Sequence, residues 1–212
     1  RRLNRITSPK PQVLPIPVGA QSVTQYLEQW QQTEYFSNQP KRTILLRGLC
    51  GSLSPNYTIG DIVLYQECVG TAKASEQCLQ PCDGNFSTEL HRQLQEKASL
   101  VRAITSDRVI SSAAEKRELG QLYAADVVDM EGFAVLNTLN QVGAAVAMLR
   151  VVSDDCHHDI PDLSAALSAD GSMRPLPMAI AFGRQPVAAT RLITGALRGL
   201  RVLQDVTTRL FQ

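Results

Sequence analysis

The sequence predicts an α/β protein, and three consecutive segments in its second half carry this prediction. Val127 and Val128 form a short apolar run that ends at Asp129. Residues 133–141 place apolar side chains at helical spacing, and residues 144–152 form a nearly continuous apolar run. This order predicts a strand, a helix and a second strand joined by a right-handed crossover, which is typical of a buried parallel sheet.

Length and composition favour one domain that spans residues 1–212. A chain of 212 residues can bury a sizeable core without staples. The net charge is +1 and no basic patch is concentrated, which argues against nucleic acid as a partner. No apolar stretch reaches the roughly 18–20 residues of a membrane span. No secretory signal is visible either, although the chain opens at Arg1.

In the first half, the apolar residues 13–18 predict a short edge strand, because two prolines interrupt them. Residues 22–30 predict a helix with one apolar face, for which Ser22 is a plausible N-cap. Residues 44–46 predict a strand that runs into a glycine-containing loop, and residues 62–65 predict the next strand.

In the second half, the sequence predicts a loop, a polar helix, a strand and three more helices around the segments described above. Their expected positions are the loop at 77–87, the polar helix at 88–97, the strand at 100–105, and helices beginning at 111–115, near 178–182 and after Pro186. The last helix carries an apolar stripe, made of Leu192, Ala196, Leu200, Leu203, Val206 and Leu210. Its arginines are expected on a solvated face.

Two acidic residues follow the apolar runs of the predicted crossover. Glu131 and Asp154 come at the ends of the two strands. Parallel strands end at the same edge of a sheet, where open α/β sheets bind ligands, so both carboxylates should line one site. The alternatives are structural, because acids are favoured in the first turn of a helix and Asp154-Asp155 could form a turn or a cap.

The five cysteines form no compact framework, and their odd number predicts reduced thiols in a cytoplasmic protein. Cys78 and Cys82, with residues 156–159 (CHHD), raise the alternative of a metal site or of a metal-assisted hydrolase. Their spacing matches no familiar zinc pattern, and adjacent histidines cannot easily face one ion. We therefore expect no metal and no cofactor.

Three motifs, in order, resemble those of the nucleoside phosphorylase and nucleosidase superfamily, which includes purine nucleoside phosphorylases and methylthioadenosine/S-adenosylhomocysteine nucleosidases. Residues 48–55 (GLCGSLSP) and 59–63 (IGDIV) are similar to its Gly-rich loop and the strand that follows. Residues 128–134 (VDMEGFA) resemble its Met-Glu motif, and residues 150–154 (RVVSD) its Arg-x-x-Ser-Asp motif. The resemblance implies a doubly wound mixed sheet flanked by helices, in homo-oligomers that are dimers or trimer-based.

The same resemblance implies a nucleoside-like substrate and assigns roles to residues. Met130 and Glu131 would contact the ribose. A carboxylate can accept hydrogen bonds from the ribose hydroxyls. Asp154 would be the catalytic acid that protonates or hydrogen-bonds the departing purine, because an unprotonated purine anion is a poor leaving group. The other substrate-binding positions implied by the motifs are Cys50, Gly51, Val109, Ile110 and Ser153.

The chain departs from the family pattern at several positions. Leu49 replaces a Ser or Thr hydroxyl, Val109 stands where nucleosidases stack an aromatic ring, and nothing before Val13 matches the first family strand. Arg47 could contact phosphate but reads more simply as a surface arginine. We expect cleavage of an N-glycosidic bond, with water favoured over phosphate as co-substrate. The alternative is a catalytically impaired nucleoside-binding protein on the same fold.

Overall fold

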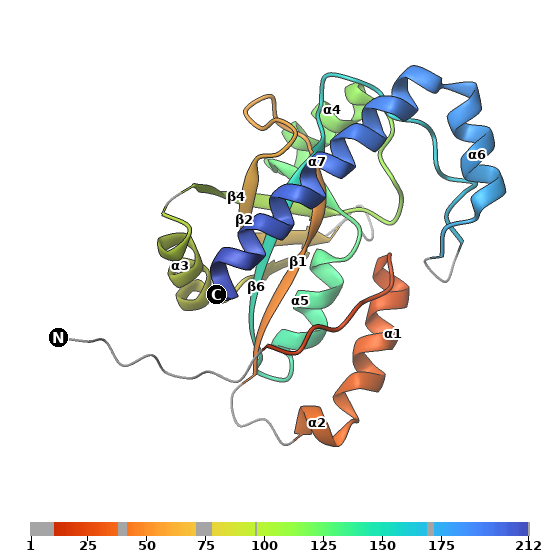
Figure 1. The fold of residues 1–212 in the computed structure, drawn as a ribbon. Coiled ribbons are helices and arrows are strands. Elements are labelled where there is room, and N and C mark those ends of the chain that lie inside the picture. The colour runs from red at the N-terminus through yellow and green to blue at the C-terminus, as the bar shows by residue number, and fades with distance from the viewer. Residues whose placement is uncertain (1–10, 38–41, 71–77, 96, 169–171, 212) are drawn as a thin grey trace.

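The computed structural model describes residues 11–37, 42–70, 78–95, 97–168 and 172–211 (Figure 1). The strands are β1 (Thr43–Ser52), β2 (Ile62–Gly70), β3 (Cys78–Pro81), β4 (Ala98–Thr105), β5 (Val127–Asp129) and β6 (Ala145–Asp154). The helices are α1 (Ala20–Gln31), α2 (Glu34–Ser37), α3 (Gly84–Gln93), α4 (Ala113–Tyr123), α5 (Gly132–Asn140), α6 (Pro175–Arg184) and α7 (Pro186–Phe211).

The sheet closes on itself. Its strand order is β3-β2-β4-β5-β1-β6, and β2 also pairs with β6, so β2, β4, β5, β1 and β6 form a barrel with β3 as an added edge strand. The β1–β6, β2–β4 and β4–β5 pairs are parallel, whereas β1–β5, β2–β6 and β2–β3 are antiparallel. The predicted α/β fold with a mixed sheet flanked by helices is confirmed. The closure into a barrel is an addition that no local pattern indicated.

The predicted parallel crossover is wrong in its topology, although its strand, helix and strand all exist. β5 and β6 are not neighbours, because β1 lies between them, parallel to β6 and antiparallel to β5. Apolar runs indicate which segments are buried, but they do not encode which strands pair. The argument that placed Glu131 and Asp154 at one carboxyl edge therefore fails.

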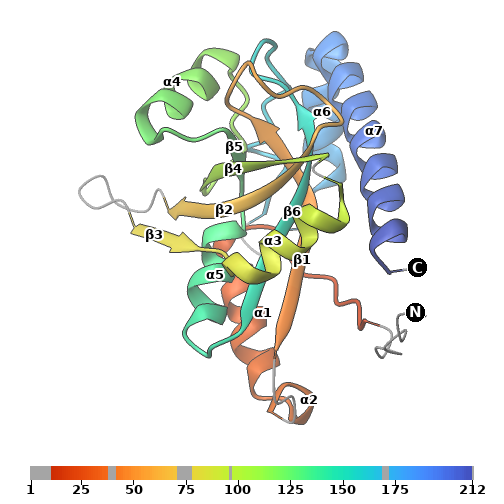
Figure 2. The same cartoon turned by 90° about the vertical axis from the view of Figure 1, so that its left-hand side faces the viewer.

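Helices cover two sides of the barrel (Figures 1 and 2). Side chains alternate along β6, as they must in any strand. Val146, Met148 and Val152 pack in one cluster with α1 and α5. The residues between them, Ala147, Leu149 and Val151, pack in another cluster with α3 and α7. A third, smaller cluster joins α4 to β4 and β5.

The first described segment differs from its prediction. Residues 13–18 form no strand, and α1 begins after Gly19, whose φ of 93° lies where only glycine is readily accommodated. Ser22 is not the N-cap, since it lies inside the helix. β1 does not stop at Leu46 but continues to Ser52, so the expected glycine loop is part of a strand.

Other boundaries differ by a few residues. The predicted loop 77–87, whose first residue lies outside the described part, contains β3 and the start of α3. α3 starts early because Asp83 Oδ1 accepts the N–H of Phe86 at 2.7 Å. The capping prediction for α4 is confirmed, because Ser112 Oγ accepts the N–H of Glu115 at 3.4 Å. α6 already begins at Pro175, a residue tolerated in a first helical turn.

The long helix α7 lies very close to β6. A Cβ on Gly195 would lie 2.2 Å from the carbonyl oxygen of Ser153, and one on Gly199 would lie 2.9 Å from Leu49. These glycines belong to the buried face with Leu203 and Val206, whereas Leu200 of the predicted stripe is 50% exposed. Among the described residues, no helix is both long and apolar enough to cross a membrane.

Candidate active site

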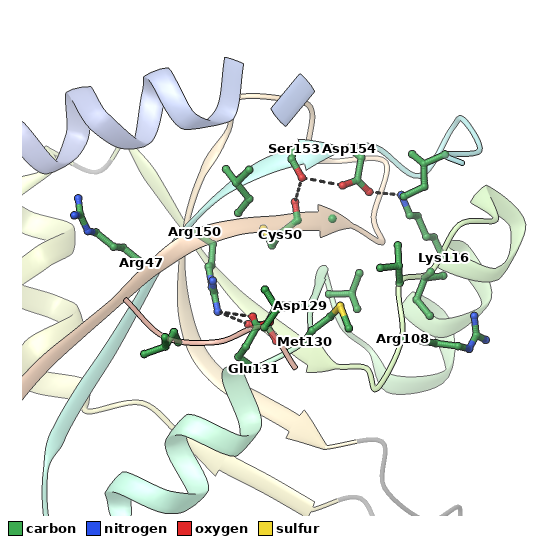
Figure 3. Close-up of a pocket in the computed structure, with 18 of the residues that line it drawn as sticks. Arg47, Cys50, Arg108, Lys116, Asp129, Met130, Glu131, Arg150, Ser153 and Asp154 are labelled. Atoms are coloured by element: carbon green, nitrogen blue, oxygen red, sulfur yellow. Dashed lines mark hydrogen bonds and ion pairs between the residues drawn. The ribbon is translucent and has the colours of Figure 1, made fainter. Parts of the chain in front are cut away.

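A cavity of about 400 Å³ opens where the ends of β1, β5 and β6 meet α4 and the segment before α1 (Figure 3). Its volume lies in the roughly 300–1,000 Å³ range of small-molecule sites. All eight residues for which the sequence predicted a catalytic or substrate-binding role line this cavity: Cys50, Gly51, Val109, Ile110, Met130, Glu131, Ser153 and Asp154. Their roles remain predictions, but the fold brings them together.

Two glycines of β1 make room for two charged side chains of β6. In the parallel β1–β6 pairing, Gly48 is the partner of Arg150 and Gly51 is the partner of Asp154. A Cβ on Gly48 would lie 2.2 Å from Nη1 of Arg150, so a larger residue there would displace the guanidinium. Gly48 and Gly51 therefore have a physical reason other than the loop that the sequence predicted. They let the side chains of the neighbouring strand turn inward.

One end of the cavity holds a buried ion network. Asp129, with 1% of its side chain exposed, accepts from Arg150 Nη2 at 2.9 Å, from Thr105 Oγ1 at 2.7 Å and from the N–H of Gly132 at 3.0 Å. Glu131 lies 3.5 Å from the same Nη2. These contacts hold Asp129 firmly and leave Glu131, at the cavity surface, as the less committed carboxylate (Figure 3).

Burial shifts the protonation equilibria at this end. Desolvation raises the pKa of Glu131 by more than the Arg150 guanidinium lowers it. For Arg150, burial opposes the charged form but the carboxylates outweigh it, above all that of Asp129, so its pKa is raised and it stays a cation. Burial also raises the pKa of the Cys50 thiol far above its usual range, so this cysteine is not a thiolate nucleophile.

The other end of the cavity is built around Asp154. Its Oδ1 accepts from Ser153 Oγ at 2.8 Å, and its Oδ2 forms an ion pair with Nζ of Lys116. Lys116 comes from α4, is 1% exposed, and also donates to the carbonyl of Asp155 at 3.0 Å. The cavity is thus charged at both ends, with Cys50 of β1 between them (Figure 3).

Comparison with known proteins identifies the fold family. A family model described as the phosphorylase superfamily matches residues 19–170. The chain belongs to the phosphorylase superfamily. This confirms the resemblance that the three sequence motifs indicated. No curated protein sequence matches the chain significantly.

Solved structures of nucleosidases share the fold of this phosphorylase-superfamily chain. A 5′-methylthioadenosine/S-adenosylhomocysteine nucleosidase variant from Helicobacter pylori, with 5′-methylthioadenosine in its active site, has a TM-score of 0.61 at 14% identity, over 90% of this chain and 77% of that one. The Campylobacter jejuni nucleosidase has a TM-score of 0.58 at 16% sequence identity, over 89% of this chain and 78% of that one. Futalosine hydrolase from H. pylori has a TM-score of 0.55 at 15% sequence identity, over 89% of this chain and 76% of that one. At these identities the similarity concerns the fold.

The cavity walls of this superfamily member are aliphatic. Ile16, Pro17 and Val18, in the segment before α1, line it beside Ile160 and the predicted Val109 and Ile110. This segment is tied to the site, because the N–H of Gly19 donates to Glu131 Oε1 at 3.0 Å. Glu131 therefore does not act as a side-chain cap of its own helix, α5. Its carboxylate instead accepts from Gly19, the residue that precedes α1.

The acidic and histidine residues after Asp154 have structural roles in the phosphorylase-superfamily fold. Asp155 accepts the N–H groups of His157 and His158 at 2.9 and 3.0 Å, which is the turn that the structural alternative described. Asp159 accepts the N–H of Ala113 at 2.7 Å, at the start of α4. In the described ranges, no group of three or more His, Cys, Asp or Glu side chains is arranged to hold a metal ion.

Sequence reasoning missed the charged partners of the site. Lys116 belongs to none of the sequence motifs. It lies on the same face of α4 as the buried Ala113 and the closely packed Gly120, and this spacing directs its side chain toward the interior. Asp129, inside the Met-Glu motif, was not singled out. Arg47, which could have contacted phosphate, is instead an exposed residue at the cavity rim that donates to Thr207 Oγ1 at 2.8 Å.

Proposed function

We propose that this phosphorylase-superfamily protein cleaves the N-glycosidic bond of a purine nucleoside or a related ribosyl compound. The observation that carries the proposal is the placement of Glu131 and Asp154 in one cavity, on either side of Cys50 near the end of β1 (Figure 3). A ribose and a base joined by one bond need two such polar ends, and the aliphatic walls suit the flat faces of a base. The likeness to nucleosidases supports this reading of the fold.

Glu131 is suited to the sugar end. Its carboxylate accepts the N–H of Gly19 at 3.0 Å and faces the cavity beside Met130. As the glycosidic bond breaks, positive charge develops on the ribose, and hydrogen bonds from its hydroxyls to a carboxylate become stronger. The Arg150–Asp129 pair beneath Glu131 keeps it in place without supplying a free charge.

Asp154 is suited to the base end. Ser153 and Lys116 fix its two carboxyl oxygens, and Gly51 gives it room. A fixed carboxyl group beside a ring nitrogen can hold the proton that a departing purine needs. The hydroxyl of Ser153 orients Asp154 and also lies 3.2 Å from the carbonyl oxygen of Cys50.

Water is the nucleophile that the site's charges favour. Three carboxylates, Asp129, Glu131 and Asp154, face two cations, Arg150 and Lys116, in the ion pairs of the cavity. A phosphate dianion beside these pairs would meet cations that are already neutralised, which is unfavourable in a partly buried site. Two more arginines line the cavity: Arg108 is paired with Glu115, and Arg47 lies at the exposed rim, where it contacts the neutral Thr207. Leu49 lines the cavity without offering a hydroxyl.

The decisive experiment incubates the purified protein with a panel of purine nucleosides, with and without phosphate, and identifies base and sugar by chromatography. We expect free base and free ribose in equal amounts at a rate independent of phosphate. The Asp154→Asn variant should lose at least about 100-fold in turnover, a typical value for loss of a general acid. Unchanged turnover in this variant would remove Asp154 from the mechanism, and ribose 1-phosphate formed in proportion to phosphate would overturn hydrolysis.

A second candidate function is nucleoside binding without turnover. The hydrogen bond from Gly19 to Glu131 favours this function. It places the segment before α1 against the carboxylate that we propose binds the ribose, so part of that carboxylate is already occupied. Calorimetric binding of a nucleoside, with no base released over a long incubation, would select this function. The family resemblance also leads us to propose a homo-oligomer, which sedimentation of the purified protein measures directly.

A further inference from the structure

The cavity contains one charged group that the proposed function has not used as a reactant. Lys116 lines the cavity from α4 and is 1% exposed. Its Nζ contacts Asp154 Oδ2 and the carbonyl oxygen of Asp155. An ammonium has three N–H bonds, and within the described residues these two acceptors account for two of them.

A buried lysine is an expensive way to build a helix–sheet contact. Desolvating an ammonium and a carboxylate costs free energy that their attraction does not fully return, and apolar residues of similar size often serve stability as well or better. The neighbouring buried position on the same face of α4, Ala113, is apolar. The fold therefore does not explain why a cation stands behind Asp154.

The ion pair also changes where the proton lies. In the contact between Lys116 and Asp154, Nζ is the hydrogen-bond donor and Oδ2 is the acceptor. The hydroxyl of Ser153 donates to the other oxygen, so both oxygens of Asp154 accept hydrogen bonds. An acid catalyst at this end of the cavity needs Lys116 as well as Asp154.

We propose that Lys116 is the proton source for the leaving base, acting through Asp154. This inference rests on the proposed function. Asp154 contacts the base nitrogen, and the proton passes from Lys116 Nζ to Asp154 Oδ2 and on to that nitrogen as the base leaves. Lys116 is thus a positioning residue: it supplies the proton to Asp154, and Asp154 is the residue that contacts the substrate.

The step balances as follows. The C1′–N bond breaks and both of its electrons pass to the base, while one proton moves from Nζ across the carboxyl group to a base nitrogen. The base leaves neutral, the lysine becomes a neutral amine, and the ribose becomes an oxocarbenium ion. Water adds at C1′ and releases a proton, and that proton returns Lys116 to an ammonium.

Leaving groups that differ in their need for a proton provide the test. A purine requires protonation, whereas the nitrophenolate of p-nitrophenyl ribofuranoside leaves readily as an anion. We would measure kcat/KM on both substrates for wild type, Lys116→Met and Lys116→Arg. Lys97→Met, at an exposed lysine outside the cavity, is the matched control. Thermal melting reports whether each variant is folded.

We expect Lys116→Met to lose about 100-fold or more on the purine nucleoside, the size of a general-acid contribution, and to lose less than about threefold on the nitrophenyl substrate. Lys116→Arg keeps the ion pair but holds its proton too tightly to give it up, so it should show the same selective loss. It also serves as the test if the methionine variant does not fold. The Lys97→Met control should match wild type on both substrates.

Two results would overturn the inference while leaving the proposed function intact. An equal loss on both substrates would mean that Lys116 only shapes the site. No loss on the purine in either variant would mean that Asp154 obtains its proton elsewhere. Wild-type protein that cleaves neither substrate would instead overturn the proposed function, and the role of Lys116 with it.

Discussion

Gly51 and Asp154 face each other across the parallel pair β1–β6, so closely that a Cβ on Gly51 would lie 2.7 Å from Asp154 Oδ2. The contact lies at a register shift between Cys50 and Gly51, where the two strands fall out of step. The same oxygen is the one that pairs with Lys116. A methyl group at Gly51 would therefore press on the proton-transfer end of the cavity without removing any polar group.

The first prediction follows from this contact. Gly51→Ala should lower the rate of base release at least about tenfold, because a displaced catalytic carboxyl loses its alignment with the substrate. Steady-state kinetics on a purine nucleoside checks it. Gly84→Ala is the matched control, since a Cβ at Gly84 meets nothing within 4 Å. Equal rates in the two variants would show that Asp154 tolerates the shift.

The second prediction concerns the buried pair Asp129–Arg150. Asp129→Ala should lower the free energy of unfolding by about 3–5 kcal/mol, because it leaves a buried guanidinium without its main partner. Urea denaturation measures the change. Glu89→Ala breaks the exposed pair with Arg92 and should cost much less, because solvent screens that pair. Similar losses in both variants would contradict a specific role for burial.

The third prediction concerns the sugar. If Glu131 accepts the ribose hydroxyls, Glu131→Gln should reduce the preference for a ribonucleoside over its 2′-deoxy form. Loss of a charged acceptor for a hydroxyl costs on the order of 1.5–3 kcal/mol. Calorimetry of both ligands with both proteins gives the four binding constants that are needed. An unchanged preference would restrict Glu131 to its contact with Gly19.

The fourth prediction uses the pH dependence of stability. Burial raises the pKa of Glu131 above the ordinary glutamate value of about 4.5, so the folded state binds this proton more tightly than the unfolded state. The resulting penalty is absent below about pH 4.5 and is complete above the folded-state pKa. Relative to wild type, the melting temperature of Glu131→Gln should therefore increase as the pH rises through this window.

A control with the opposite sign is available for this pH experiment. The hydrogen bond from Arg92 lowers the pKa of Glu89. Glu89→Gln should therefore lose stability relative to wild type as the pH rises through the range in which Glu89 ionises. Parallel trends in the two variants would mean that the difference does not come from the burial of Glu131.

The sequence predicted the secondary structure better than the topology. Local periodicity is enough to place α5 and β6, because the spacing of apolar side chains is set by helix and strand geometry. Strand pairing depends on contacts between distant segments, and nothing in residues 127–152 signals that β1 inserts between β5 and β6. The motif resemblance indicated Glu131 and Asp154 without relying on strand topology, and both residues line one cavity. The parallel-edge argument indicated the same two residues from a strand pairing that the structure does not have.

The two glycines of β1 show why part of the site was harder to predict. Gly48 and Gly51 suggested a loop, because a glycine is usually needed by its own backbone. Here they are needed by Arg150 and Asp154, which belong to a strand about a hundred residues later. Lys116 was missed for a related reason, since a lysine on a helix ordinarily faces solvent. Its partner is likewise remote in sequence.

The close approach of α7 to β6 affects how variants of this protein should be chosen. Gly195 would carry its Cβ 2.2 Å from the carbonyl oxygen of Ser153, and the hydroxyl of Ser153 holds Asp154. A mutant library restricted to cavity-lining positions omits Gly195, although a methyl group there would push the strand that carries the carboxyl group of Asp154, the proposed catalytic acid. Random mutagenesis under selection for activity should therefore recover substitutions in the last helix, at positions that a search by distance from the ligand would leave untouched.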